Sequence, residues 1–294
     1  MPTVRDLRDR IRSLKNTQQI TKAMKQVAAA KIRRAEAAQK QARPYADALS
    51  EMLRDLIAAV SAVDDPFMRP GKAGAPSGII LISADKGLAG AFNSNVIAAA
   101  QQAARERGEV RYYTVGLKAR NAVRRMGIRD AKAWPLSAGA KLDVAREVAI
   151  PASDDFRAGS ISEIVLVSQR LISMMSQRPQ TRKLVPILAK DMAELRGAEK
   201  TDERQQRGAM EFLPSPEFVL SRLLPKYLEF TIYSAMLETE AAFFAAQLVA
   251  MTNATDNASK LIDELTIQMN NARQAAITKE LLEIVAGAEA LGVE

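Results

Sequence analysis

The residues best suited to chemistry lie in one short glycine-containing segment, Ser83 to Asn93. It carries an acid and a base side by side, Asp85 and Lys86, and lies between an expected strand and an expected helix. In a doubly wound sheet, phosphate groups bind at this place. The segment lacks G-x-G-x-x-G, however, and Lys86 precedes Gly87, whereas a P-loop ends in Gly-Lys-Ser/Thr. We therefore expect Asp85 and Lys86 to cap and contact neighbouring backbone, with a nucleotide or small-molecule site as the alternative.

Composition removes several other kinds of chemistry. The chain contains no Cys and no His. Thiolate nucleophiles, Cys/His metal sites, Ser-His-Asp triads and imidazole acid–base catalysis are therefore excluded together. The amino terminus lacks the apolar region of a secretory signal, and the longest apolar stretch, Ala241–Met251, is about half a membrane span. These features indicate a mechanical or scaffolding protein more than an enzyme.

Two long segments of the chain contain almost no helix-breaking residues. Neither Gly nor Pro occurs between Lys226 and Ala286, and Pro44 is the only proline from Thr3 to Asp65. Ordinary helices average about 11–12 residues. At about 1.5 Å per residue, either stretch could extend roughly 90 Å as a helix. We therefore expect a long helix in residues 1–62 and another in residues 209–294.

The ends of these helices and their apolar stripes carry recognisable signals. Thr3 is the expected amino-terminal cap of the first helix, with the amide of Asp6 as donor. Pro44 is expected to bend that helix without ending it. Pro225 is expected to separate a short helix, which starts after Ser215, from the long one. Both long helices carry apolar stripes with alanines at seam positions, which favours an antiparallel coiled coil.

Between the long helices, residues 77–195 change in character to alternating strands and helices. This pattern predicts a Rossmann-like, mostly parallel α/β domain inserted between the helices. The expected strands are residues 78–83, 111–116, 163–171 and a short last one at 184–188. The expected helices are residues 93–107, 117–126 and one near 141–148.

Charge is distributed unevenly over a chain whose net charge is +8. Residues 1–43 contain 12 Lys/Arg and 3 Asp/Glu, whereas residues 251–294 contain 3 Lys/Arg and 7 Asp/Glu. The two ends should attract each other, and the basic one could face an acidic partner. A nucleic acid or an anionic membrane is the alternative partner for the basic helix. The aromatic content of 5% argues against base stacking.

Three segments carry a family pattern. They are Lys15–Lys31 (KNTQQITKAMKQVAAAK), Asp85–Asn93 (DKGLAGAFN) and Asn271–Gly287 (NARQAAITKELLEIVAG), the last preceded by Asn253–Ala258 (NATDNA). In this order they resemble the gamma subunit of F-type ATP synthases, and the resemblance covers nearly the whole chain. It implies a rotating, non-catalytic central stalk without cofactors. Its coiled coil would turn inside a ring of alpha and beta subunits.

The resemblance also implies partners and contact residues. Arg273, Gln274 and Thr278 match positions that hydrogen-bond to a beta-subunit loop. The basic face would meet acidic lever segments of beta subunits; it comprises Lys22, Lys25, Lys31, Arg33 and Arg34. Near the carboxy end, the residues expected to slide in a hydrophobic bearing are Ile284, Val285, Ala288 and Leu291. The α/β domain would contact the epsilon subunit and the c-ring, and only the c-ring would link it to the membrane.

Two departures from the family pattern are visible. Residues 238–249 are more apolar than the usual charged stretch, and the Cys-bearing regulatory insert of chloroplast forms is missing. The second departure excludes thiol control and predicts a bacterial protein. We expect it on the cytoplasmic side of the inner membrane, as a peripheral subunit that does not bind nucleic acid.

Overall fold

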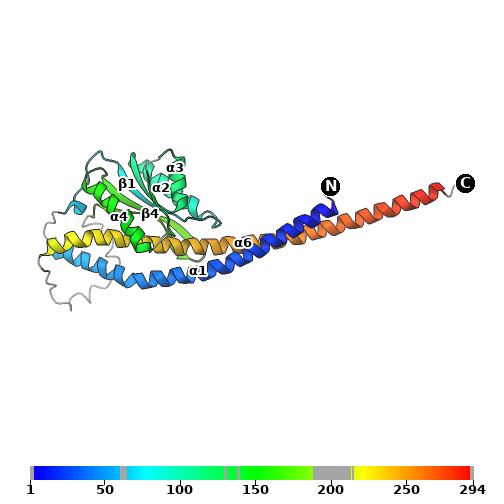
Figure 1. Ribbon diagram of the computed structural model, residues 1–294, viewed down its shortest axis with the longest axis horizontal. Helices are drawn as coiled ribbons and strands as arrows, with labels where there is room; N and C mark the ends of the chain where they lie inside the picture. The colour runs from blue at the N-terminus through cyan, green and yellow to red at the C-terminus, as the bar shows by residue number, and fades with distance from the viewer. Residues whose placement is uncertain are drawn as a thin grey trace. The chain divides into compact units, whose positions relative to one another are not determined.

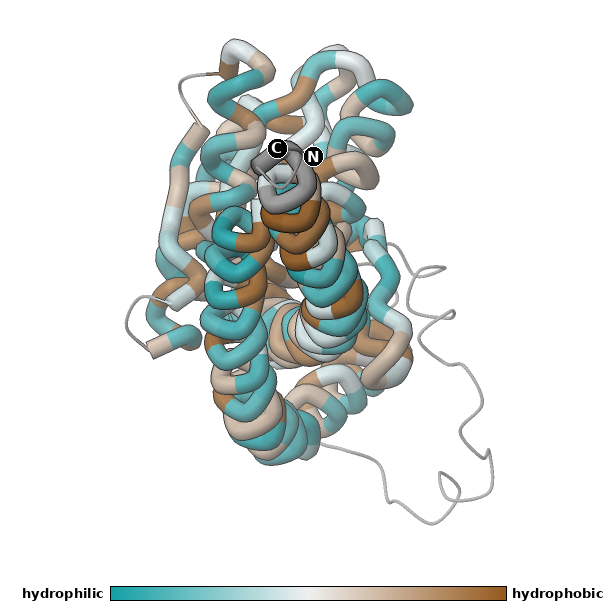
Figure 2. Tube along the Cα trace, turned by 90° about the vertical axis from the view of Figure 1, so that its right-hand side faces the viewer, coloured by the Kyte–Doolittle hydropathy of each residue, from teal (hydrophilic) through white to brown (hydrophobic). Residues whose placement is uncertain are grey.

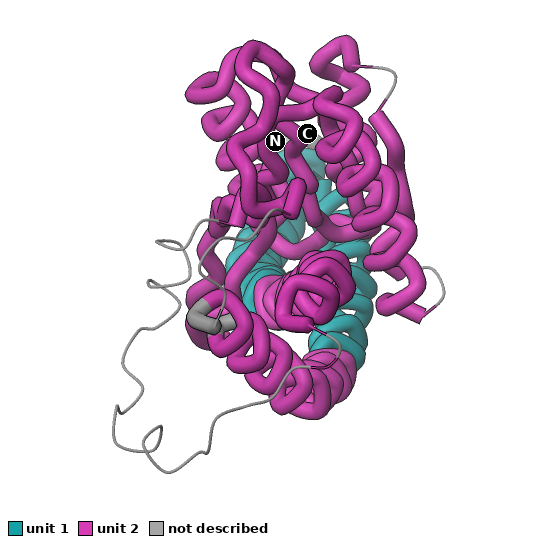
Figure 3. The backbone as a smooth tube through the Cα atoms, turned by 90° about the vertical axis from the view of Figure 1, so that its left-hand side faces the viewer, with its two compact units in different colours: residues 1–29, 247–294 teal, residues 30–246 magenta. Residues whose placement is uncertain are grey.

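A computed structural model describes residues 3–59, 65–128, 131–137, 140–187, 213 and 215–291. The chain divides into two compact units, which Figure 3 shows in different colours. Unit 1 contains Met1–Ala29 and Gln247–Glu294, and unit 2 contains Ala30–Ala246. Two helices, α1 (Val4–Ala59) and α6 (Pro216–Leu291), contribute to both units. The boundaries expected at residues 62, 195 and 209 lie outside the described residues.

Helix α1 begins at a reciprocal cap and continues through its proline. The backbone N–H of Asp6 donates to Thr3 Oγ1 at 3.2 Å, and the N–H of Thr3 donates to Asp6 Oδ2 at 3.0 Å. These hydrogen bonds hold the pKa of Asp6 below its ordinary value. Pro44 lies inside the helix without ending it. Both sequence predictions for this helix, the cap and the continuation, are therefore confirmed.

Helix α6 also continues through a proline, and here the prediction of a break was wrong. Ser215 Oγ accepts a hydrogen bond from the N–H of Phe218 at 3.3 Å, as expected for a helix start. The helix then runs unbroken over 76 residues with Pro225 inside it. Leu224 and Leu228 on either side of the proline are buried in the core of unit 2. This burial offsets the one helical hydrogen bond that a proline removes.

The sheet of unit 2 has five strands in the order β3-β2-β1-β4-β5. Pairs β1·β2, β1·β4 and β2·β3 are parallel, and only β4·β5 is antiparallel. The predicted mostly parallel α/β domain is thus confirmed, but the last strand is longer and earlier than residues 184–188. The strands are β1 Ser77–Ile82, β2 Val110–Val115, β3 Lys132–Trp134, β4 Glu163–Ser173 and β5 Ser176–Val185.

Helices cover both faces of this sheet, as Figure 1 shows. Ile79 and Leu81 of β1 pack with α2 (Phe92–Arg107) and α3 (Leu117–Arg125) on one face. Ile80 and Ile82 point to the other face, where α4 (Lys141–Arg157) packs with the unit 2 parts of α1 and α6. Helix α4 extends past the predicted end at Val148 and includes Pro151. A 3-10 turn, Pro66–Met68, adds Phe67 to this core.

Unit 1 is a pair of antiparallel helices with a narrow seam. Its buried apolar residues are Leu7, Ile11, Ala28, Met251 and Ala258. At its centre Thr255 Oγ1 donates to Thr21 Oγ1 at 2.8 Å, which joins the two helices directly. Apolar and polar residues alternate along both helices (Figure 2), and the buried positions fall at helical spacing among exposed ones, which is a narrow stripe. Within the described residues, neither long helix contains a stretch apolar enough to span a bilayer.

Candidate functional site

The Ser83–Asn93 segment is folded around its own polar groups. Asp85 accepts hydrogen bonds from three backbone N–H groups: Leu117 at 2.9 Å, Leu136 at 3.1 Å and Ser137 at 2.8 Å. Burial disfavours the ionised carboxylate, but these hydrogen bonds outweigh it and lower the pKa of Asp85. Asp85 therefore caps the start of α3 and fixes the chain after β3. The predicted capping role is confirmed for this residue.

The rest of the segment forms a tight turn that docks on α6. Asn93 Oδ1 accepts from the N–H of Ala84 at 3.2 Å, and its Nδ2 donates to the carbonyl of Lys86 at 3.1 Å. Ala84, Ala89 and Phe92 pack against three residues of α6, which are Ala242, Phe243 and Ala246. The geometry is that of a structural connection between the sheet and the long helix.

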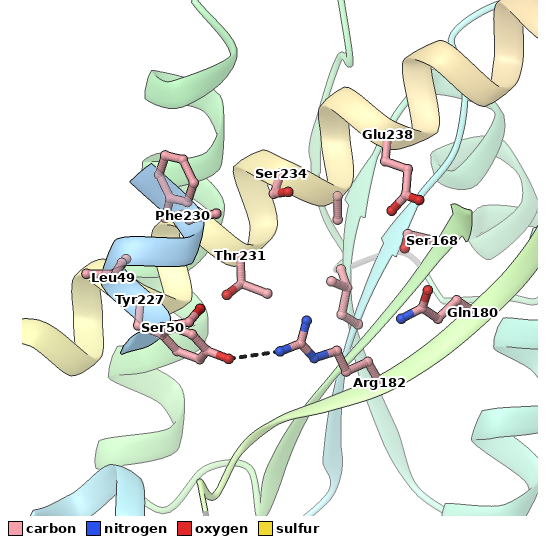
Figure 4. A pocket seen from close by; sticks show the side chains of 13 residues that line it. Leu49, Ser50, Ser168, Gln180, Arg182, Tyr227, Phe230, Thr231, Ser234 and Glu238 are labelled. Atoms are coloured by element: carbon pink, nitrogen blue, oxygen red, sulfur yellow. Dashed lines mark hydrogen bonds between the residues drawn. The ribbon is translucent and has the colours of Figure 1, made fainter. Parts of the chain in front are cut away.

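A polar cavity of about 120 Å³ lies in unit 2 among α1, α6, β4 and β5 (Figure 4). Arg182 Nη2 donates to the hydroxyl of Tyr227 at 2.8 Å on one wall, and Glu238 lies on another. Burial raises the pKa of Glu238. Sequence reasoning missed this cavity because its residues come from four elements and share no motif. Across the described part of the chain, no cluster of three or more acidic residues is placed to hold a metal.

The residues expected to contact a beta-subunit loop lie exposed on α6. Arg273, Gln274 and Thr278 belong to a stretch, residues 273–287, in which every side chain is exposed. Of the expected bearing residues, Ile284 is 67% and Val285 56% exposed. Ala288 and Leu291 belong to the same helix, but their side chains lie outside what the structure describes.

The five expected basic contacts are exposed on α1. Lys22 and Lys25 of unit 1 line a groove together with Gln18, Gln26 and Thr255. The other three belong to unit 2 and are Lys31, Arg33 and Arg34. Lys31 Nζ lies 5.2 Å from the ring centre of Phe244, a cation–π distance. Two of the five charges thus share one groove, and all five lie exposed on the surface of α1.

Together these features define a class of protein: an α/β domain with two long terminal helices that pair with each other and carry many exposed side chains. Comparison with known proteins gives the family. A family model described as ATP synthase matches residues 3–291. The ATP synthase gamma chain of Heliobacterium modesticaldum is 42% identical over 99% of this chain and 100% of its own length. That of Pelotomaculum thermopropionicum is 43% identical with the same coverage. The chain belongs to the ATP synthase gamma-chain family.

Solved structures share the fold. A chain of the Euglena gracilis mitochondrial ATP synthase matches with a TM-score of 0.67 and 18% identity, over 98% of this chain and 94% of that one. A chain from the Tetrahymena thermophila central stalk and c-ring gives a TM-score of 0.58 and 20% identity. That match covers 80% of this chain and 99% of the other. At this identity the likeness concerns the arrangement of the helices and the α/β domain.

Proposed function

We propose that this chain is the central rotor stalk of a bacterial F-type ATP synthase. It couples proton flow through the membrane c-ring to conformational cycling of the alpha3beta3 hexamer. The observation that carries the proposal is the exposed stretch of α6, where each of the residues 273–287 is exposed. Exposed apolar side chains gathered on one helix mark a surface for other proteins. They are Ile277, Leu281, Leu282, Ile284 and Val285.

The apolar end of α6 suits a bearing. Apolar contacts are non-directional, so a surface of this kind can turn against an apolar ring without losing specific bonds at each step. Ile284, Val285, Ala288 and Leu291 would form this surface. The predicted hydrogen-bonding residues Arg273, Gln274 and Thr278 precede it and would engage a loop of one beta subunit.

The basic residues of α1 suit passing contacts. Exposed ion pairs are each worth about 0–1 kcal/mol, so they form and break without holding the rotor in one orientation. Lys22, Lys25, Lys31, Arg33 and Arg34 would meet acidic lever segments of successive beta subunits. The absence of His and Cys fits a subunit without catalytic or redox chemistry of its own.

We assign the remaining partners to the α/β domain. It would contact the epsilon subunit and the c-ring, and it would need neither cofactor nor nucleic acid. The location that follows is the cytoplasmic side of the inner membrane, where the subunit is attached through the c-ring.

A reversible tether tests rotation directly. Because the chain contains no Cys, Ala276→Cys introduces its single thiol, on an exposed position of α6. Oxidation to a disulfide between this thiol and a cysteine introduced into one beta subunit should abolish ATP turnover, and reduction of the disulfide should restore it.

The matched control is Ala98→Cys, an exposed alanine of α2 that lies outside the predicted contact surface. It should give no cross-link to beta and no loss of turnover. Full turnover in complexes tethered through Ala276→Cys would rule out a rotor role. Hydrolysis of ATP by the isolated chain would rule out a non-catalytic one.

A further inference from the structure

Two ion pairs join α6 to α4 within unit 2. Lys141 Nζ lies 3.0 Å from Glu240 Oε2, and the side chains are 23% and 21% exposed. Arg146 approaches Glu229 with two nitrogens: Nε and Nη2 are both 3.1 Å from Oε1. The Glu229 side chain is 10% exposed and that of Arg146 is 45% exposed. In these contacts, called here the α4–α6 ion pairs, both acids are therefore largely shielded from water.

The spacing of the acids places both on one face of α6. Glu229 and Glu240 are eleven residues apart, which is three helical turns plus about 20°. Their partners occur in the reverse order on α4, since the earlier residue, Lys141, contacts the later acid. The two helices therefore run antiparallel, and the contacts fix α6 at two points separated by roughly 16 Å along its axis.

An apolar stripe on α6 lies beside these acids, and polar contacts border it on the other side too. Leu228, Ile232 and Met236 are buried in the core of the domain. On the other side of this stripe, Tyr227 accepts a hydrogen bond from Arg182 of β5. Within the stripe, the buried Thr239 Oγ1 accepts one from the N–H of Gln169 at 3.3 Å. Turning α6 would pull these apolar side chains out of the core, and the paired charges at the border add contacts with a preferred geometry.

We propose that the α4–α6 ion pairs prevent α6 from turning about its own axis relative to the α/β domain. Lys141, Arg146, Glu229 and Glu240 are then positioning residues through which torque passes between that domain and the long helix. The inference rests on the proposed rotor function, and it adds the contacts that hold α6 in place on the α/β domain.

Charge reversal of the Lys141–Glu240 pair tests this, because within the described residues this pair shares its charges with no other ion pair. A bead attached through Asn121→Cys, on the exposed face of α3, reports the rotation of the α/β domain in a complex whose hexamer is fixed. Glu240→Lys places two cations together. Because this pair is one of several contacts that hold α6, losing it should measurably raise the angular variance of the bead during pauses.

The double variant Lys141→Glu with Glu240→Lys restores an opposite pair and should return the variance to that of the unsubstituted chain. If Glu240→Lys fails to assemble into the complex, Glu240→Gln is measured in its place. It removes the negative charge and should also raise the variance. The matched control is Asp47→Lys, which breaks an exposed pair with Arg43 on α1 and should leave the variance unchanged. The inference would be overturned, and the rotor function left standing, if neither Glu240→Lys nor Glu240→Gln changed the variance. The same holds if the double variant had as large a variance as Glu240→Lys. Absence of rotation with the unsubstituted chain would overturn the rotor function as well.

Discussion

At the scale of single residues, Asp85 joins parts of the chain that are far apart in sequence. Its carboxylate accepts three backbone hydrogen bonds, from the first residue of α3 and from the segment after β3. Hydrogen bonds to a charged acceptor each contribute about 1.5–3 kcal/mol, less where water competes. Asp85→Ala should therefore lower the free energy of unfolding by about 2 kcal/mol, measured by urea denaturation at pH 7.

The same variant should change the response to acid. The folded-state pKa of Asp85 is lowered, so its contribution is complete above its unfolded pKa and is lost as pH falls through the folded value. Between pH 5 and pH 2, the unsubstituted chain should lose more stability than Asp85→Ala. Asp47→Ala, on an exposed face of α1, serves as the control and should follow the unsubstituted chain. Parallel acid profiles for Asp85→Ala and the unsubstituted chain would contradict the assignment.

A second residue-scale prediction concerns Gly116, which connects β2 to α3. Its φ is +94°, and a Cβ there would lie 2.2 Å from the carbonyl oxygen of Ser83. Gly116→Ala combines a left-handed backbone with a clash against main chain, so we expect a loss of more than about 3 kcal/mol. Gly87→Ala is the control, since its nearest neighbour is Lys118 Cε at 3.9 Å. Thermal melts measure the difference. An equal decrease in Tm for Gly116→Ala and Gly87→Ala would refute the predicted clash at Gly116.

At the scale of elements, sequence predicted what periodicity and capping determine. The long helices, the Thr3 cap and three buried strands have strong local signals, and all three strands lie within one or two residues of their predicted ends. Strand β5 does not have such a signal. It is a polar edge strand containing Pro179, and its pairing with β4 is set by the hairpin and not by an apolar pattern. Tertiary burial likewise decided the outcome at Pro225, against its local tendency to break a helix.

The helix pair of unit 1 depends on small residues in its seam. Ala28 is fully buried, whereas Ala23 in the same helix is exposed. Ala28→Leu should overpack the seam and destabilise the pair by about 1–3 kcal/mol. Ala23→Leu adds the same side chain facing water and should be nearly neutral. Amide hydrogen exchange of the α1 peptide that contains residue 21 distinguishes them, and equal protection in both variants would argue against close packing.

At the scale of the whole molecule, the two ends of α6 differ in how far they are buried. In unit 2 many of its residues are buried in the core with the sheet and α4, while residues 273–287 near its carboxy end are all exposed. From the sequence, the family pattern predicted partner contacts in this stretch, and these stay a prediction. The α4–α6 ion pairs and the polar cavity could not be predicted from the sequence, because their residues come from elements that are far apart along the chain. Helicity at the exposed end therefore rests on intrinsic propensity, which Ala, Leu, Glu and Lys supply.

Because the helicity of residues 273–287 depends on intrinsic propensity, glycine substitutions there should weaken the transmission of torque. Each Ala→Gly change in a helix interior costs about 0.5–1 kcal/mol, and an uncovered helical end of this length is marginal in water. Ala275→Gly with Ala276→Gly should therefore raise amide exchange across residues 273–287 while leaving residues 227–246 protected. In the assembled complex, ATP-driven proton pumping should fall more than ATP hydrolysis, because a flexible segment transmits less torque. The control pair, Ala98→Gly with Ala99→Gly in α2, should leave exchange at residues 273–287 unchanged. A loosened end with undiminished pumping would show that a stiff terminal helix is not required for coupling.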